Sequence, residues 1–150
     1  YAKDKESTGW LPLKTKGNVS GLARWLYHSD EWCKRHPIFD GMQAGGLMDY
    51  AYYRELIPDV GFTGIEMPGD PVAGGINASQ GYQSALLVGV YQLGAGEFIL
   101  NSLNIRANLG QTPQAERLLR NMLRFAGRNV AAPLAELPAD FEGMLKTFGY

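Results

Sequence analysis

Cysteine is nearly absent from this sequence, because Cys33 is the only one among 150 residues. It cannot form a disulfide bond within the chain, and it excludes zinc and iron–sulfur sites that are built from several cysteines. Histidine is also rare, and His28 and His36 form neither a His-x-x-x-His nor a His-x-Glu pattern. We therefore expect no metal ion and no other cofactor. A chain of this length buries roughly 70% of its unfolded surface, so it needs no such cross-link to fold.

Long apolar runs, phosphate-binding loops and a surplus of basic charge are missing as well. The longest mostly apolar run spans residues 85–91, far short of the roughly 20 residues that cross a membrane. Gly94 and Gly96 lack the third glycine and the helix of a dinucleotide-binding motif. The net charge is −1, from 14 basic and 15 acidic side chains. These absences argue against a membrane, a nucleotide or a nucleic acid as the partner.

The small net charge hides an uneven distribution. Residues 1–37 carry seven basic and four acidic groups, residues 38–100 one and seven, and residues 101–150 six and four. The last part includes three arginines on one side of an expected helix: Arg117, Arg120 and Arg124. One interpretation is a solvated helix face. The other is an interface for an acidic neighbour, either the acidic stretch of this chain or another domain.

The clearest structural pattern lies in the second half of the chain. Ser84–Tyr91 and Glu97–Asn101 are rich in residues that favour strands, and Gly94-Ala95-Gly96 separates them, which predicts an antiparallel hairpin. Apolar residues then recur at helical spacing from Pro113 to Gly127. We expect this amphipathic helix to bury Leu118, Leu119, Met122 and Leu123.

Both strands of the expected hairpin are almost continuously apolar, which is typical of strands covered on both faces. The sequence therefore predicts an α/β fold with helices on both sides of a sheet. We divide the chain into an irregular segment over residues 1–20, interpreted as loop or edge strand, and one α/β domain over residues 21–150. Local patterns within that domain predict a brief helix from about residue 30 to Pro37, helical turns over residues 47–56, a connecting loop over residues 59–75 and a short helix over residues 140–148.

Catalytic patterns in the sequence are weak. Acidic residues are plentiful between residues 30 and 70, but most lie beside glycine or proline, where solvated turns are the ordinary explanation. Cys33 and His36 are three residues apart, which favours a buried thiol over a catalytic pair. We therefore assign no catalytic residue.

Aromatic residues gather near these acids. Trp25, Tyr27 and Trp32, together with Asp49 and Tyr53, are the residue types from which a sugar-binding platform is built. Packing in the core or in an interface is the alternative for the same rings.

Several short phrases together resemble the C-terminal region of bacterial multidomain glycoside hydrolases of the family 2 type, the β-galactosidase and β-glucuronidase group. The phrases are Trp25-Leu26-Tyr27-His28, His36-Pro37-Ile38-Phe39-Asp40-Gly41, Gly46-Leu47-Met48-Asp49-Tyr50 with Tyr53, Leu87-Val88-Gly89-Val90-Tyr91 through Gly94-Ala95-Gly96-Glu97-Phe98, and Ala115-Glu116-Arg117-Leu118-Leu119-Arg120-Asn121-Met122-Leu123. The resemblance covers about residues 20–128.

The resemblance implies a non-catalytic accessory or oligomerisation domain. The region is similar to the C-terminal part of a flavodoxin-type or class I glutamine-amidotransferase-like sandwich that has lost its own catalysis, and the catalytic glutamates of the family lie in a separate barrel domain. It implies a bacterial source and other domains of the parent chain as partners, and it allows a homo-oligomer. The alternatives are a carbohydrate-binding module that uses Trp25, Tyr27 and Trp32, and a small independent hydrolase.

The sequence begins abruptly at Tyr1, so we expect it to be a piece of a longer chain. A sandwich without its first half would leave one sheet edge and one apolar face open. The compartment is left open, whether secreted, periplasmic or cytoplasmic.

Overall fold

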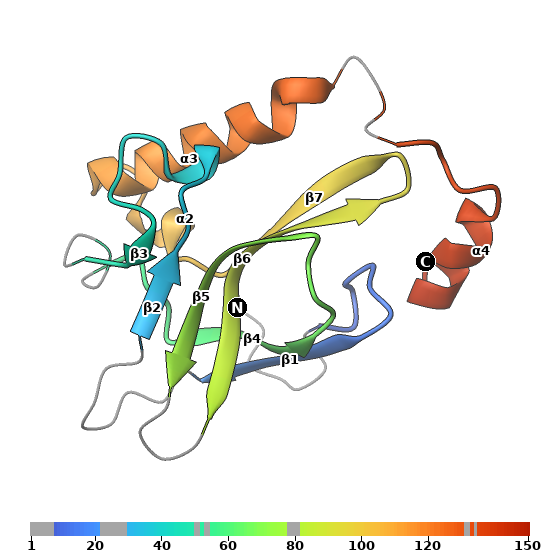
Figure 1. Cartoon of the computed structure of the whole chain (residues 1–150), viewed down its shortest axis with the longest axis horizontal. Helices are drawn as coiled ribbons and strands as arrows, with labels where there is room; N and C mark the ends of the chain where they lie inside the picture. Colours follow the sequence, from blue (N-terminus) through green and yellow to red (C-terminus); the bar gives the residue numbers. More distant parts are fainter. Residues whose placement is uncertain are drawn as a thin grey trace.

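The computed structural model describes residues 8–21, 30–49, 52, 55–77, 82–130, 133 and 135–150. They form a mixed α/β fold around one open antiparallel sheet of seven strands (Figure 1). The strands are β1 (Lys16–Gly21), β2 (Asp30–Cys33), β3 (Gly46–Leu47), β4 (Val60–Ile65), β5 (Asp70–Asn77), β6 (Gln83–Leu93) and β7 (Gly96–Asn101). The helices are α2 (Ile105–Asn108), α3 (Pro113–Ala126) and α4 (Phe141–Phe148), with the 3-10 helices η1 (Pro37–Phe39) and η2 (Gly127–Asn129).

The sheet is organised around its longest strand, β6. The strand order is β1-β4-β6-β5-β2-β3, and β7 also pairs with β6. Strand β5 follows one edge of β6, whereas β4 and β7 share the other edge: β4 meets β6 at Leu86, and β7 pairs with it from Val88 to Leu93. The predicted hairpin is confirmed as β6 and β7, and Gly94 adopts the left-handed φ of 57° in the turn between them.

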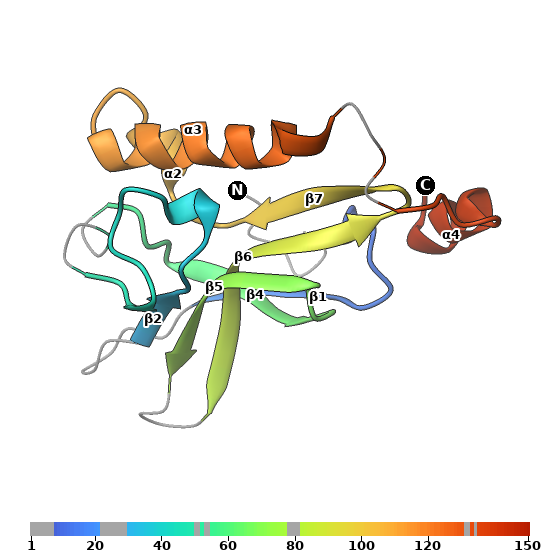
Figure 2. The same ribbon diagram turned by 45° about the horizontal axis from the view of Figure 1, so that its top comes forward.

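The expected mixture of helices and strands is confirmed, but the arrangement differs from a flavodoxin-type sandwich. Such a sandwich has mostly parallel strands with helices on both faces. Every pairing between the described strands is antiparallel. Helices α2 and α3 lie on one side of the sheet, and α4 lies beyond the turn of the β6–β7 hairpin (Figure 2). The helical layer that we expected on the second face is not found among the described residues.

The two faces of the sheet carry separate apolar clusters. Successive residues of a strand point to opposite faces, so Leu87 lies in the cluster under α3 while Leu86 packs against the other cluster. On this second face, Leu11 and Leu13 pack near Phe62, and residues 8–15 thus cover part of it. An irregular segment takes the place that a helix was expected to occupy.

Helix α3 begins and ends where the sequence predicts. Oγ1 of Thr112 accepts a hydrogen bond from the N–H of Ala115, and Pro113 occupies the first turn. Leu118 is fully buried, but Leu123 is 64% exposed, so the expectation that Leu123 belongs to the core is wrong. Each residue turns a helix by about 100°, which places Leu123 about 140° around the axis from Leu118.

Two local predictions are corrected by the strands. Residues 59–75, predicted as a loop, form most of β4 and β5, and residues 30–33, predicted as helix, form β2. Glycine permits the close approach of neighbours there: a methyl group on Gly74 would lie 2.8 Å from the carbonyl oxygen of Ala85 and 3.0 Å from Cζ2 of Trp32. Pairing with distant strands outweighs local propensity in both segments.

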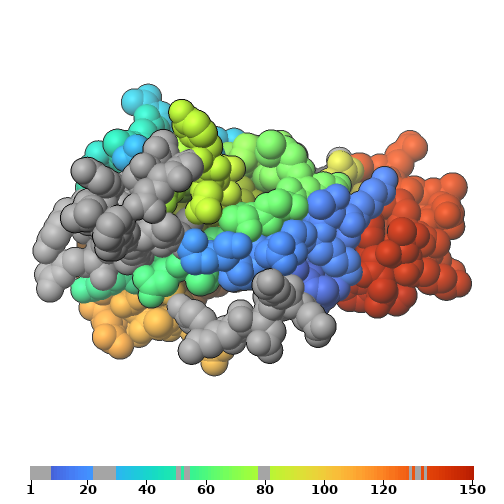
Figure 3. Space-filling view, turned by 90° about the horizontal axis from the view of Figure 1, so that it is seen from below, coloured from blue at the N-terminus to red at the C-terminus, as the bar shows by residue number. Residues whose placement is uncertain are grey.

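The two ends of the described chain meet. The prediction that residues 16–20 are irregular is corrected, because they form most of the edge strand β1. The predicted short C-terminal helix is confirmed as α4. Figure 3 shows the N-terminal end of the described chain, in blue, beside its C-terminal end, in red. There Nζ of Lys16 donates to the carbonyl of Phe148, and the hydroxyl of Tyr150 donates to the carbonyl of Trp10.

Two further observations complete the fold. Of the helical turns predicted over residues 47–56, Leu47 lies in β3 and Tyr52 is helical, while residues 50–51 and 53–54 lie outside the described residues. No helix in the described part of the chain is long and apolar enough to cross a membrane.

Candidate functional site

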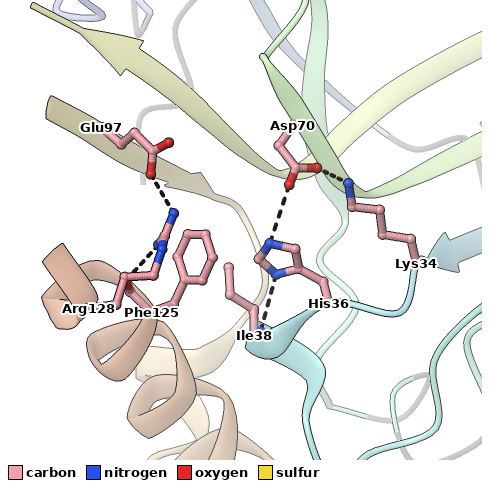
Figure 4. Close-up of polar contacts among 7 residues, drawn as sticks. All are labelled: Lys34, His36, Ile38, Asp70, Glu97, Phe125 and Arg128. Carbon is pink, nitrogen blue, oxygen red and sulfur yellow. Dashed lines mark hydrogen bonds and ion pairs between the residues drawn. The ribbon is translucent and has the colours of Figure 1, made fainter. Parts of the chain in front are cut away.

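A cluster of charged side chains joins β2, η1 and β5 (Figure 4). Asp70 begins β5 and pairs with Lys34, which follows β2. Nε2 of His36 lies 3.4 Å from Oδ2 of the same carboxylate, and the His36 side chain is only 7% exposed. Asp70 therefore binds a surface cation and a buried imidazole at once.

Both ring nitrogens of His36 are engaged. Nδ1 accepts a hydrogen bond from the N–H of Ile38 at 3.2 Å and so caps η1. Nε2 must then carry the proton and donate toward Asp70. Burial lowers the pKa of His36, and the positive charges of Lys34 and Arg128 lower it further. The ring is therefore suited to hold the loop in place and has no nitrogen left to act as a general base.

Phe125 connects this cluster to β7. Its ring centroid lies 4.6 Å from that of His36, and the guanidinium carbon of Arg128 lies 3.3 Å from the Phe125 centroid. Arg128 also pairs with Glu97 on β7, with Nη2 and Oε2 2.8 Å apart. An arginine of η2, just past the end of α3, thus pairs with one acidic residue of the 38–100 stretch of the same chain.

Cys33 does not form a nucleophile–base pair with His36. Its side chain is buried on the α3 side of the sheet, and Sγ donates to the carbonyl of Gln43 at 3.6 Å. Burial raises the pKa of the thiol, which keeps it protonated and unreactive. The geometry agrees with the interpretation of Cys33 as a buried thiol.

A cleft of about 280 Å³ opens between the loop after η1 and the first turns of α3, and we call it the polar cleft because two charged side chains and two glutamines line it. Its lining residues are Gly41, Met42, Gln43, Asp49, Tyr52, Pro113, Gln114 and Arg117. The cleft brings together Asp49, expected as a sugar contact, and Arg117, expected as an interface residue. Nη1 of Arg117 donates to the carbonyl of Gly41 at 3.2 Å.

An apolar groove of about 330 Å³ lies on the face of the sheet opposite α3. Strand pairing aligns one residue from each of six strands in a row: Leu47, Trp32, Gly74, Leu86, Phe62 and Val19. Directly paired residues project from the same face of a sheet, so this row is continuous and apolar. We call these six residues the apolar row.

The groove exposes part of two side chains of the apolar row, those of Trp32 and Leu86. Ile76 is 48% exposed and Met67 is 79% exposed at its margins, and Trp32 is partly exposed between the strands. Among the lining residues, the only polar side-chain groups are those of Glu66 and Ser84 and the indole N–H of Trp32. The groove therefore suits an apolar partner better than a ligand held by many hydrogen bonds.

The Glu66 carboxylate is already used by the chain. Oε2 of Glu66 accepts hydrogen bonds from the N–H groups of Lys14 and Thr15. These bonds hold the segment before β1 against the end of β4, so Glu66 serves the fold.

The predicted site residues separate into different places. Trp25, Tyr27 and Tyr53 lie outside the described residues. Trp32 lines the apolar groove, whereas Asp49 lines the polar cleft on the α3 side, so these two do not share one site. The remaining two predicted interface residues are exposed on α3 and make no ion pair with another described residue: Arg120 and Arg124.

Sequence reasoning missed Gln114 and Asn121. Gln114 lines the polar cleft, and nothing in its local sequence distinguishes it from an ordinary surface residue. Asn121 is 7% exposed and donates to two loop carbonyls. The sequence does contain a signal for Asn121, since it is a polar residue within the apolar stripe of an amphipathic helix. Buried polar groups require hydrogen-bond partners, so such a residue is expected to bind a neighbouring segment.

The described residues contain no group of three histidine, cysteine or acidic side chains that could hold a metal ion. Comparisons with protein-family models, with curated proteins and with solved structures find no match.

Proposed function

We propose that this chain is a non-catalytic accessory domain of a carbohydrate-cleaving enzyme of the family 2 glycoside hydrolase kind, and that it packs on another domain or subunit through the apolar groove. The observation that carries this proposal is the apolar groove, where the partly exposed Trp32 and Leu86 of the apolar row lie beside the exposed Ile76. Contiguous apolar surface of this kind commonly marks an interaction site.

The finer fold assignment belongs to the same proposal. The antiparallel sheet would form the C-terminal part of a flavodoxin-type or glutamine-amidotransferase-like sandwich, and the parallel strands would belong to other parts of the parent chain. The phrases that resemble family 2 proteins support this assignment, and the wholly antiparallel pairing of the described strands counts against a complete sandwich within them.

An independent hydrolase has less support. Glycoside hydrolysis requires two carboxyl groups that face one glycosidic bond. Asp70 is paired with Lys34 and His36, and Glu97 is paired with Arg128. These acids hold elements of the fold together.

Sedimentation velocity of the chain at micromolar concentration tests the packing role. We expect the chain to self-associate through the groove when no natural partner covers it, and Ile76→Asp to make it monomeric because a charge would then lie on the apolar surface. Leu123→Glu is the matched control, since Leu123 is also apolar and is 64% exposed but lies on α3, on the other side of the sheet.

Two results would contradict the proposal. One is a monomeric wild-type chain that unfolds in a single cooperative transition, because the open face would then need no partner. The other is hydrolysis of a nitrophenyl glycoside that is lost when one acidic residue of this chain is replaced, because the domain would then be catalytic.

A further inference from the structure

The polar cleft beside α3 is not used by the packing role, and it lies on the opposite side of the sheet from the apolar groove. We infer that it binds a single ring of a neutral sugar or similar polyol through Asp49, Arg117, Gln43 and Gln114. The inference concerns a different surface from the proposed function and does not depend on it.

The loop wall of the cleft is held in place before any ligand arrives. Nδ2 of Asn121 donates to the carbonyls of Ile38 and Asp40 at 3.1 and 3.0 Å. The hydroxyl of Tyr52 donates to the carbonyl of Gln43 at 2.6 Å, and Tyr52 itself is 1% exposed. The side chains of Asn121, on α3, and of Tyr52 therefore bind the backbone of this loop at several points. A wall that is already ordered loses little entropy on binding.

Gly41 and Arg117 are fitted to each other at the mouth of the cleft. Gly41 has a φ of 73°, in the left-handed region, and a methyl group there would overlap Nη1 of Arg117. The absence of a side chain lets the guanidinium reach the Gly41 carbonyl. One of its five N–H donors is used in that bond, and the guanidinium keeps its charge at any physiological pH. Arg117 is thus positioned by the loop and still has donors for a ligand.

The polar groups of the cleft match hydroxyl chemistry. Asp49 supplies carboxylate acceptors, Arg117 supplies donors, and the amides of Gln43 and Gln114 supply both. One negative and one positive side chain leave no net charge to select an anion or a cation. A sugar hydroxyl both donates and accepts, so neighbouring hydroxyls can bind the carboxylate and the guanidinium together.

The size and the remaining lining set the ligand class. A volume of about 280 Å³ lies near the lower end of small-molecule pockets, which start at roughly 300 Å³, so a single sugar ring is the size of ligand that fits within it. Met42 and Pro113 add carbon surface that the C–H groups of a pyranose can contact. The aromatic ring of Tyr52 is buried, so hydrogen bonding and not stacking provides the specificity.

Titration of the full 150-residue chain with D-glucose, D-galactose and acetate, followed by nitrogen–proton correlation spectra, tests the inference. The side-chain amides of Gln43 and Gln114 are reporters inside the cleft, and that of Gln92, exposed on β6, is the reporter outside it. We expect one of the two sugars to shift the first two amides saturably in the millimolar range while Gln92 stays still. Acetate, which offers a charge without hydroxyls, should shift none of them.

Matched variants identify the side chains responsible. Asp49→Asn and Gln114→Ala should each weaken sugar binding by about tenfold, as expected when one hydrogen-bonding group is lost. Asp40→Asn and Arg120→Gln change exposed charges outside the lining and should leave the affinity unchanged. Gln114 lies in the first turn of α3 and is not part of the core, so this variant remains informative if Asp49→Asn does not fold.

Three outcomes would overturn the inference. They are no shift with either sugar up to its solubility limit, equal affinity in wild type and Gln114→Ala, and saturable shifts with acetate but with neither sugar. None of them alters the expected sedimentation of the Ile76→Asp variant, so failure here is distinguishable from failure of the packing role.

Discussion

The side-chain amide of Asn121 donates to the backbone carbonyl of Ile38 at 3.1 Å, across 83 positions of sequence. The same nitrogen donates to the carbonyl of Asp40 at 3.0 Å, and Asn121 is 7% exposed. One buried side chain therefore fastens the loop after η1 to α3 and shapes the wall of the polar cleft.

Replacing Asn121 with alanine should lower the free energy of unfolding by about 2–4 kcal/mol, because two carbonyls lose a donor. Urea denaturation measures this loss. Arg120→Ala, at the neighbouring exposed position, is the control and should change stability by less than about 0.5 kcal/mol. Equal effects of the two substitutions would show that the amide does not hold the loop.

The orientation of α3 predicts unequal costs for two leucines. Leu118→Ala removes a fully buried side chain and should cost about 2–5 kcal/mol, whereas Leu123→Ala should cost less than about 0.5 kcal/mol at a position 64% exposed. Thermal or urea unfolding of both variants checks the difference. Similar losses at both positions would mean that Leu123 is part of the core after all.

His36 should make stability depend on pH. Its folded pKa is lowered from 6.5 by burial, so the neutral ring's contribution is fully present above about pH 6.5 and is lost as the pH falls through the folded pKa. Protonating Nδ1 would also break its bond with the N–H of Ile38. Urea unfolding at a series of pH values between 7.5 and 5 measures the slope.

The matched variant is His36→Asn, which retains a capping acceptor but does not titrate. Its stability should fall less steeply over the same pH range than that of the wild type. An unchanged slope would assign the pH dependence to other groups.

Gly74→Ala should destabilise the sheet by about 1–3 kcal/mol, because the added methyl group meets the Ala85 carbonyl at 2.8 Å and the Trp32 ring at 3.0 Å. Gly46→Ala, on β3, meets no atom within 4 Å and is the control. Differential scanning calorimetry of both variants compares their melting temperatures. A Gly74→Ala protein as stable as wild type would show that the indole and strand can move apart at little cost.

Much of the second half of the fold could be predicted from sequence because its information is local. Two nearly continuous apolar runs on either side of Gly94 predict the hairpin, and Pro113 and Gly127 delimit α3. Within this correctly predicted helix, the assignment of Leu123 to the buried face was wrong. The width of an apolar stripe is visible in sequence, but the angle at which the helix meets the sheet is not.

The sequence by itself determined that the fold mixes helices and strands, and it determined the hairpin, the two longer helices and the absence of any multi-cysteine site. Tertiary structure alone decided that most of residues 59–75 form the strands β4 and β5, because their glycines become favourable only where neighbouring strands approach closely. It also decided that Asp49 and Arg117 line one cleft while Trp32 lies on the other face. Such juxtapositions join residues far apart along the chain, and they exist only once the loops have closed and the sheet has formed.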